Sequence, residues 1–582
     1  MGSSDPFTIS LTGELPFLLI STAVLAWPVS LGLLKFYRSK VIKTMSTTVD
    51  SHKNQISFSQ DTETPDSCSA QTHQSQLHIE LLDASSTLPM SSTPQWLFKK
   101  IIQAPNRLGL VYIGGGLCYA LIMTWCYLTA TDNAFLLKRF LLLFWLYAWP
   151  TALAILFVAA STSETKRLII AAYCVIFLIL SVWVALGNPD VSVVDMPRVW
   201  LIYNLGPTIL LYCFLTRNIR AVGPLVFSFM VVAMIGSHLA LSLASNTDSS
   251  LLTVTQIGMA LGLNAVGIFI GLILVGFAIF ASLGWLLAQY IGKLYKNKTV
   301  SDQSITVDAL FLLFGIVHPI SLVFEGIGWI LSGPLAFLGY KISFRIRNSL
   351  LGDKPQTSDS IPRLLLLRVF SLGKRSEELF DALGLHWRHA GPIQLIAGPD
   401  LATTTVEPHE FLDFLSGKLA RRFIDSPETL SARFKELDIQ PDQDGRFRVT
   451  DFFCHDDTWQ MVLSKLVGKS DVILMDLRGF SRLNAGCQYE IQELINVVAL
   501  EQAVFVIDHT TDESLLQEML YQFWSQITPS SPNAKQPRAK LTIFRLQSIK
   551  KSEFHQLLRI ICRTTENVFG NARTKAKEIC VA

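Results

Sequence analysis

Long apolar segments run through residues 1–345 and constrain the fold more than any other feature of the sequence. A helix needs roughly 20 predominantly apolar residues to cross a lipid bilayer. Hydrophobic residues make up 50% of the chain and charged residues 16%, which is unusually apolar for a soluble protein of 582 residues. The segments long enough to cross are residues 15–36, 108–130, 140–160, 168–187, 199–215, 223–245 and 258–291. The sequence therefore predicts an all-α transmembrane helical bundle, with a first helix in residues 1–37 and a multi-pass region in residues 108–345.

The apolar segment at residues 307–340 fits neither one crossing nor two. As a single helix it would be about 50 Å long at 1.5 Å per residue, whereas the hydrocarbon core is about 30 Å thick. Pro319 and Pro334 interrupt it, and Gly326 lies between them. We therefore expect a re-entrant or interfacial element here.

Lys and Arg in the loops predict the orientation, because basic loops stay on the cytoplasmic side. Basic clusters occur at residues 38–43, 166–167, 217–220 and 293–298. This pattern fits an outside N-terminus, seven crossings and a cytoplasmic C-terminal half, with residues 138–139 as the exception. We expect an integral protein of the inner or plasma membrane, embedded in its lipid bilayer.

The connector at residues 38–107 contains many Ser, Thr, Gln and His residues and few large apolar ones up to about residue 92. Such a composition buries too little apolar surface to offset the entropy of ordering the chain. We expect a flexible cytoplasmic connector. Within it, the stretch QLHIELLDA has the alternative of a short amphipathic helix or strand.

The C-terminal part of the chain alternates in the α/β manner after a linker at residues 346–361. Short apolar runs typical of buried parallel strands are separated by segments with helical periodicity. These runs are residues 364–370, 393–398, 471–477, 503–508 and 541–546. The pattern predicts a flavodoxin-like, doubly wound parallel sheet in residues 362–565, followed by a tail at residues 566–582.

Ligands of doubly wound sheets bind beyond the carboxyl ends of the strands. This rule directs attention to residues 371–375, 399–408, 478–488 and 509–511. The candidate ligand-binding residues at these strand ends are Ser371, Lys374, Arg375, Asp476, Arg478 and Cys487.

Four stretches resemble Toll/interleukin-1 receptor (TIR) domains. They are RVFSLGKRSEELFDAL, GPDLATTTVEPHEF, DDTWQMVLSKLVGKSDVILMDL and FSRLNAGCQYEIQEL, which together span about residues 363–546. In the last stretch Cys487, Glu490 and Ile491 fall on the Cys, Glu and Leu positions of the family pattern. Gly486 departs from it, because the family usually has Trp at that position.

The resemblance implies a bacterial-type, membrane-anchored TIR-like protein. Some such domains cleave the nicotinamide–ribose bond of NAD, and others only assemble with partners. The resemblance makes Glu490 the catalytic candidate. A fixed carboxylate stabilises the positive charge that develops on ribose when an N-glycosidic bond breaks. The structural alternative is that Glu490 only complements the helix dipole.

Arg375 and Lys374 could meet diphosphate oxygens through charge-assisted hydrogen bonds, although simple surface solvation explains them equally well. We expect the loop ends of the sheet to bring Arg375 and Glu490 into one pocket.

Other features narrow the function classes. The nine cysteines have no paired spacing and predict no metal site, and the net charge of +3 gives no reason to expect nucleic acid. Neither a GxGxxG nor a GxxxxGK(S/T) motif is present, so nucleotide triphosphate hydrolysis has no support. No cofactor is expected, and the resemblance implies NAD as a substrate. Three hypotheses remain: an NAD-cleaving signalling or effector protein, a non-enzymatic adaptor that self-associates, and a transporter or sensor with a regulatory domain.

Overall fold

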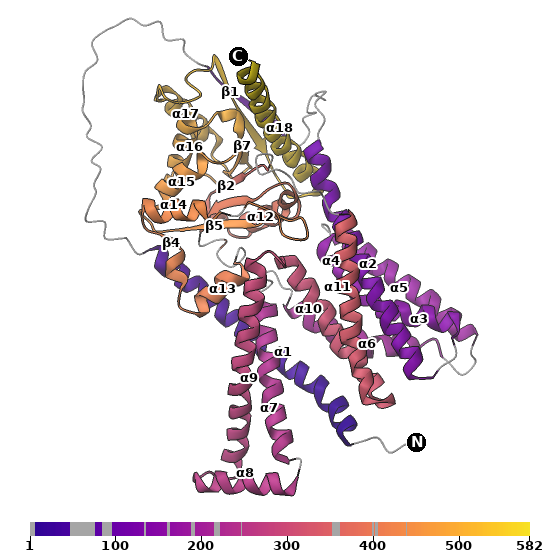
Figure 1. Ribbon diagram of the computed structural model, residues 1–582. Coiled ribbons are helices and arrows are strands. Elements are labelled where there is room, and N and C mark those ends of the chain that lie inside the picture. The colour runs from indigo at the N-terminus through magenta and orange to yellow at the C-terminus, as the bar shows by residue number, and fades with distance from the viewer. Residues whose placement is uncertain are drawn as a thin grey trace, which may run out of the picture.

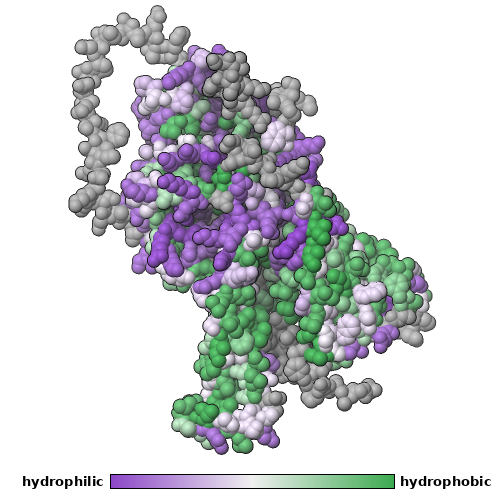
Figure 2. Space-filling view, in the orientation of Figure 1, coloured by the Kyte–Doolittle hydropathy of each residue, from purple (hydrophilic) through white to green (hydrophobic). Residues whose placement is uncertain are grey.

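The computed structural model shows a helical part joined to an α/β part (Figure 1). The described residues are 6–46, 76–83, 96–132, 135–159, 163–187, 192–214, 222–245, 247–351, 361–398, 401, 406–437 and 439–581. Apolar surface covers the helical part, and hydrophilic surface covers much of the α/β part (Figure 2). This division is that of a membrane-spanning region with a soluble domain at one end.

Seven helical stretches among the described residues are long and apolar enough to cross a membrane, judged by length and composition. They are Trp96–Ala130 (α2), Leu137–Val158 (α3 and α4), Glu164–Leu186 in α5, Gly223–Ser245 (α7), Ala265–Lys296 (α9), Asp302–Glu325 (α10 and η1) and Ile327–Leu350 (η2 and most of α11). The multi-pass prediction is thus supported, but the set of segments differs from the one expected. The predicted crossings at residues 15–36 and 199–215 lie in α1 (Pro6–Met45) and α6 (Asp195–Phe214), and neither helix belongs to the seven.

The segment at residues 307–340 forms the centre of a helical hairpin. α10 (Asp302–Val317) and α11 (Ser332–Leu351) pack against each other, joined by two short 3-10 helices that meet at Gly326, whose φ is +146°. Each arm is 24 residues long because the helices extend beyond the apolar segment at both ends. The expectation that this segment is too short for two crossings was therefore wrong.

The helical part contains a second hairpin besides α10 and α11. α7 (Gly223–Ser245) and α9 (Ala265–Lys296) stand beside each other away from α2–α5, and α8 (Asp248–Ala260) joins them at the end far from the α/β domain (Figure 1). They come close together at Gly236 and Gly276, where a Cβ on either glycine would overlap the backbone of the other helix. Small residues allow such contacts between helices in lipid.

Eight strands form one sheet in which every pairing is parallel. Its order is β1-β8-β7-β6-β2-β3-β5-β4. The strands are β1 (Gln76–Asp83), β2 (Leu364–Arg368), β3 (Ile393–Ile396), β4 (Phe423–Ile424), β5 (Val449–Cys454), β6 (Val472–Asp476), β7 (Ala503–Ile507) and β8 (Arg538–Arg545). The C-terminal α/β prediction is therefore confirmed.

The sheet is larger than the five-stranded, flavodoxin-like sheet that we expected. The five expected strands are β2, β3, β6, β7 and β8, and among themselves they follow the order 2-1-3-4-5. However, β5 and β4 extend one edge and β1 extends the other. The strand order reverses between β2 and β6, and this reversal marks the crevice in which doubly wound sheets bind ligands.

Helices cover both faces of the sheet. α15 (Trp459–Val467), α16 (Ala485–Val497) and α17 (Glu513–Ser525) share one hydrophobic core with the sheet. α12 (Lys374–His386) and α18 (Lys551–Val581) share the core on the opposite face. The predicted tail at residues 566–582 instead continues α18 as far as Val581.

Three parts of the predicted connector belong to regular elements. α1 continues to Met45, β1 pairs with β8 along its full length, and α2 begins at Trp96. Residues 47–75 and 84–95, and residues 352–360 of the predicted linker, lie outside the described residues. Leu97 and Ile101 at the start of α2 belong to the α/β core.

The Gly236–Gly276 contact predicts opposite effects on stability for two alanine variants of α9. Gly276→Ala should destabilise the protein by roughly 1–3 kcal/mol, because the added methyl group overlaps α7. Gly271→Ala is the matched control, since a Cβ there meets nothing within 4 Å. It should stabilise α9 by up to about 1 kcal/mol through helix propensity. Unfolding in detergent measures both, and equal effects of the two variants would contradict the packing described.

Candidate functional site

Glu490 lies on α16 beneath the point where the strand order reverses. α16 follows β6, and β6 pairs with β2 along its length. Glu490 is only 4% exposed, and its Oε2 atom is buried without a hydrogen-bond partner. A buried carboxylate oxygen that lacks a partner is costly in a folded protein and marks a position that needs a functional explanation.

The surroundings of Glu490 raise the pKa of its carboxyl group. Burial raises the pKa of Glu490 to about 8, and the guanidinium of Arg368, at the end of β2, opposes part of that rise. Arg368 is itself buried, and its Nη1 donates a hydrogen bond of 3.4 Å to the carbonyl oxygen of Ile396. Near neutral pH Glu490 therefore exchanges a proton readily, which suits a carboxylate that acts on a ligand.

Cys487 lies one turn before Glu490 and is buried. Its Sγ is 3.9 Å from the carbonyl oxygen of Arg368, and burial raises the pKa of the thiol well above its ordinary value. The thiol is thus neutral and packs as an apolar group. It contacts the strand end beside the carboxylate but offers no reactive thiolate.

Asp476 and Arg478 form a buried ion pair that fixes the loop after β6. Nε and Nη2 of Arg478 donate to the two carboxylate oxygens of Asp476 at 2.8 and 2.7 Å. Nη2 also donates to the carbonyl oxygen of Arg375 at 2.9 Å. This pair connects the loops after β6 and β2, so its role in the structure described is to hold the two loops together.

Arg375 has side-chain partners other than Glu490. Its guanidinium pairs with Asp508 after β7 and donates to Oγ1 of Thr510 at 3.3 Å. Arg375 starts α12, and Glu490 lies on α16, and these helices cover opposite faces of the sheet. Right-handed crossovers cause this, because the chain leaves β2 and β6 in opposite directions across the sheet.

The remaining predicted residues contribute less. Lys374 is exposed at the start of α12. Ser371 lies in a short 3-10 helix, Phe370–Leu372, and its side chain lies outside the described residues. The structure thus brings Glu490, Cys487 and Asp476 to the carboxyl ends of β2 and β6, together with Arg368, which sequence reasoning missed.

A polar junction between the membrane helices and the α/β domain was also missed. Asp302, the first residue of α10, receives hydrogen bonds of 2.9 and 3.1 Å from Arg388 and lies 3.6 Å from Arg446. Arg388 also donates to the carbonyl oxygen of Phe447 at 2.6 Å. Both arginines are buried. Partners separated by 86 residues and more along the chain leave no local sequence signal.

A second part of the junction surrounds the end of α9. The guanidinium of Arg448 lies 3.8 Å from the ring centroid of Tyr295 and pairs with Asp442 at 2.8 Å. The hydroxyl of Tyr295 donates to Oε1 of Glu407 at 2.9 Å. Burial, and then the neighbouring carboxylate of Glu410, raise the pKa of Glu407 above its ordinary value.

Metal-ligating side chains come together beside this tyrosine. Among the described residues, one group of at least three could share an ion, consisting of Glu407, His409 and Glu410, whose ligand atoms lie within 4.8 Å of one another. They occupy the N-terminal end of α13 (Pro408–Leu415). The three residues lie within four consecutive positions, Glu-Pro-His-Glu, so their closeness is visible in the sequence, whereas the spacing of the cysteines gives no sign of them.

Polar groups within the membrane helices pair with one another. His318 is fully buried, with Nδ1 3.0 Å from the hydroxyl of Tyr119 and Nε2 3.4 Å from Oδ1 of Asn204. Nζ of Lys341 lies 2.6 Å from Oδ2 of Asp308. The sequence showed no such charged pair, because its partners are 33 residues apart.

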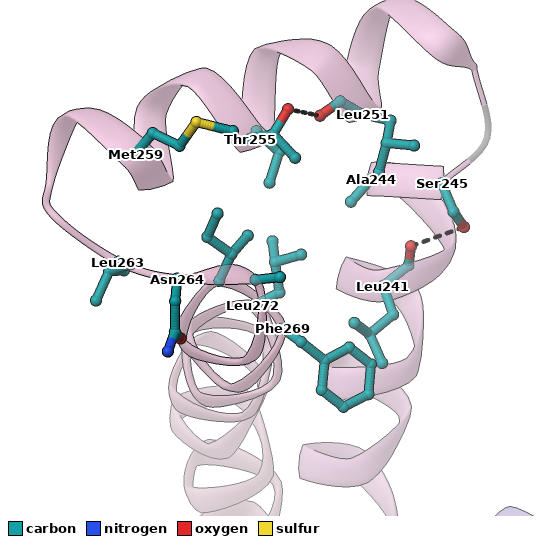
Figure 3. A pocket seen from close by; sticks show the side chains of 13 residues that line it. Leu241, Ala244, Ser245, Leu251, Thr255, Met259, Leu263, Asn264, Phe269 and Leu272 are labelled. Atoms are coloured by element: carbon teal, nitrogen blue, oxygen red, sulfur yellow. Dashed lines mark hydrogen bonds between the residues drawn. The ribbon is translucent and has the colours of Figure 1, made fainter.

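A cavity of about 540 Å³ lies between α7, α8 and α9 (Figure 3). Its polar lining groups satisfy one another: Ser245 and Thr255 donate to the carbonyl oxygens of Leu241 and Leu251. Oδ1 of Asn264 accepts from the backbone of Gly267. The lining therefore suits an apolar group such as an acyl chain and offers nothing to a dinucleotide.

Comparisons with known proteins identify no relative. No protein-family model, curated protein or solved structure matches the chain. The function therefore has to be argued from the residues and their geometry.

The raised pKa of Glu490 predicts a pH-dependent effect of Glu490→Gln on stability. Between about pH 5 and 8 the folded protein holds a proton that the unfolded chain has released, so wild-type stability falls as pH rises. Glutamine removes this dependence. The variant should gain stability relative to wild type across that window, by up to about 5 kcal/mol.

Denaturant unfolding of the full chain at several pH values measures this gain. The control is Glu518→Gln, since Glu518 is exposed on α17. A Glu490→Gln difference that stays constant from pH 5 to 8 would show that the carboxyl group is not proton-bound in the folded state.

The junction gives a prediction about Asp302→Ala. Removing this carboxylate leaves two buried guanidinium groups without their shared counter-ion, which should cost roughly 3–5 kcal/mol of folding free energy. Asp195→Ala is the control, because the Asp195–Arg198 pair is exposed and contributes at most about 1 kcal/mol. Unfolding in detergent measures both variants, and losses of similar size would argue against a buried junction.

Proposed function

We propose that this protein is a membrane-anchored signalling or effector protein whose α/β domain acts on a nucleotide ligand at the β2–β6 reversal. Following the TIR resemblance, the proposed ligand is NAD, cleaved at its nicotinamide–ribose bond. The observation that carries the proposal is Glu490, a buried carboxylate with an unpartnered oxygen at the crevice that such sheets use for ligands.

The chemistry needs one fixed negative charge near the ribose. As the bond to nicotinamide breaks, nicotinamide leaves with the bonding electrons as a neutral molecule, and the ribose carbon becomes electron-deficient. The carboxylate of Glu490 would stabilise that charge until water adds, which gives ADP-ribose and releases one proton. The cationic nicotinamide ring would itself favour the ionised form of Glu490 when NAD binds.

Arg368 is the guanidinium that acts on Glu490. Its guanidinium lowers the pKa of Glu490 against the effect of burial and so keeps the ionised form accessible. Arg375 pairs with Asp508, on the opposite side of the sheet from α16. The proposal therefore rests on Glu490 and Arg368, and it gives Arg375 no contact with the reacting bond.

We further propose that the α/β domain is cytoplasmic. It lies at the end of the helical part that carries the basic side chains: α9 ends with Lys293 and Lys296, and Lys298 donates to the carbonyl oxygen of Gln440. α11 carries Arg345 and Arg347 toward the same end. Basic residues concentrate on the cytoplasmic side of membrane proteins.

One observation favours the non-enzymatic adaptor. Glu490 is enclosed, and the Asp476–Arg478 pair ties together the loops above it, so a ligand has to part these loops to reach the carboxylate. The transporter hypothesis gains less, because the buried His318 and the Asp308–Lys341 pair are already satisfied by protein partners.

Nicotinamide release from NAD by the full chain in nanodiscs tests the enzymatic proposal. Wild type should release nicotinamide, faster as pH rises toward about 8, because the ionised carboxylate is the active form. Glu490→Gln should lose this activity by at least about 100-fold, a loss of roughly 2.7 kcal/mol in transition-state stabilisation. Glu518→Gln should retain it.

Two outcomes would decide against the enzyme. Undiminished turnover by Glu490→Gln would place the chemistry elsewhere. Absence of NAD loss in wild type, together with concentration-dependent association of the chain, would support the adaptor instead.

A further inference from the structure

The junction between the membrane helices and the α/β domain contains a group of side chains that the proposed NAD chemistry does not use. Glu407 precedes α13, and His409 and Glu410 lie in its first turn. Figure 1 shows α13 beside the upper part of α9 and close to α1. We propose that Glu407, His409 and Glu410 bind a divalent transition-metal ion, such as Zn²⁺, at this junction.

The spacing of the ligand atoms suits one small ion. Two ligands about 2.1 Å from a tetrahedral Zn²⁺ ion lie roughly 3.4 Å apart. Nδ1 of His409 lies 3.3 Å from Oε2 of Glu407, and the ligand atoms of all three residues lie within 4.8 Å of one another. One imidazole nitrogen with two carboxylate oxygens is a ligand set that Zn²⁺ accepts, with water in the fourth position.

One ring nitrogen in this group, Nδ1 of His409, lacks a hydrogen bond. Nδ1 of His409 is buried and has no hydrogen bond of acceptable geometry, although Oε2 of Glu407 is its neighbour. The ring is held in place by stacking on Tyr295, with a centroid separation of 5.6 Å and an interplanar angle of 26°. An ion that binds all three residues would give this ring nitrogen a bond in place of its poorly aligned contact with Glu407.

The carboxylates are supported from behind, as metal ligands usually are. Oε1 of Glu407 accepts from the hydroxyl of Tyr295 at 2.9 Å, which leaves Oε2 facing His409. Oε1 of Glu410 accepts from Arg422 at 3.2 Å, and Oε2 accepts from the backbone N–H of Glu407 at 3.2 Å. Tyr295 is therefore a positioning residue that connects the site to α9.

The local charge balance leaves room for a dication. Arg422 is paired with Asp413 at 2.6 Å, and Arg448 is paired with Asp442 at 2.8 Å. Arg433 faces Glu436 at 3.8 Å. Arg422 also lies 3.2 Å from Glu410, so it serves two carboxylates, and Glu407 is a third. A divalent cation would supply positive charge to Glu407 and Glu410, which one shared guanidinium only partly balances.

An ion here would fix the N-terminal end of α13, which supplies all three ligands. Glu407 and His409 both contact Tyr295 at the end of α9, so the ion would hold these side chains in the positions from which they contact α9. The site is separate from Glu490, so its existence does not depend on NAD cleavage.

Titration calorimetry with Zn²⁺ on the full chain in nanodiscs, after treatment with a chelator, tests the proposal. Wild type should bind one Zn²⁺ per chain saturably, and its thermal unfolding temperature should rise with Zn²⁺. His409→Ala and Glu407→Gln should each weaken binding by at least about tenfold. His78→Ala, on the exposed edge strand β1, is the matched control and should bind as wild type does.

Co²⁺ distinguishes this site from one made by cysteines. Binding without a thiolate-to-cobalt charge-transfer band supports the nitrogen and oxygen ligands, whereas such a band would assign the ion to cysteine and overturn the proposal. Lack of saturable Zn²⁺ binding by wild type, or wild-type affinity in His409→Ala, would overturn it too. Metal-free unfolding of each variant shows whether it remains folded.

Discussion

The helix α2 belongs to two hydrophobic cores at once, and this constrains the rest of the structure. Its first residues, including Leu97 and Ile101, pack under the sheet with α12 and α18. From Leu108 onward the same helix packs among the membrane helices. Because one continuous helix enters both cores, the α/β domain cannot rotate freely on a tether. Its position relative to the membrane helices is set by α2 and by the contacts between the two parts of the protein.

The contacts between the membrane helices and the α/β domain are polar as well as apolar. The junction buries Arg388 and Arg446 against Asp302, and Arg448 against Asp442 and Tyr295. Burying charges costs desolvation energy that a well-formed pair only about offsets, so such pairs add little net stability. They penalise wrong arrangements instead, because any slip of α10 against the domain would leave a buried guanidinium unpaired. The apolar cores hold the two halves together, and the ion pairs determine their register.

The sequence predicted features that depend on local pattern and missed those that depend on distant partners. The predicted strand at residues 471–477 was recognised because its centre, residues 472–475, is uniformly apolar. A strand at β1 was only an alternative to a flexible connector, because its partner β8 lies more than 450 residues away in sequence, and β5 was missed because Thr450 and Asp451 interrupt its apolar run. Glu490 lies near Arg368 at the carboxyl end of β2, and no pattern in the sequence indicates this neighbour, because the two residues are far apart along the chain.

The junction and the proposed catalytic carboxylate are connected through a single strand. Arg388, which binds Asp302, lies just before β3, and the carbonyl oxygen of Ile396 at the other end of β3 accepts from Arg368. Arg368 in turn adjusts the ionisation of Glu490. A membrane event can alter Glu490 along this path only if it changes how α10 holds Arg388, since coupling requires an element with two arrangements that both sites bias. The 3-10 turn at Gly326, between the two arms of the hairpin, is where the backbone geometry of that element departs most from a regular helix.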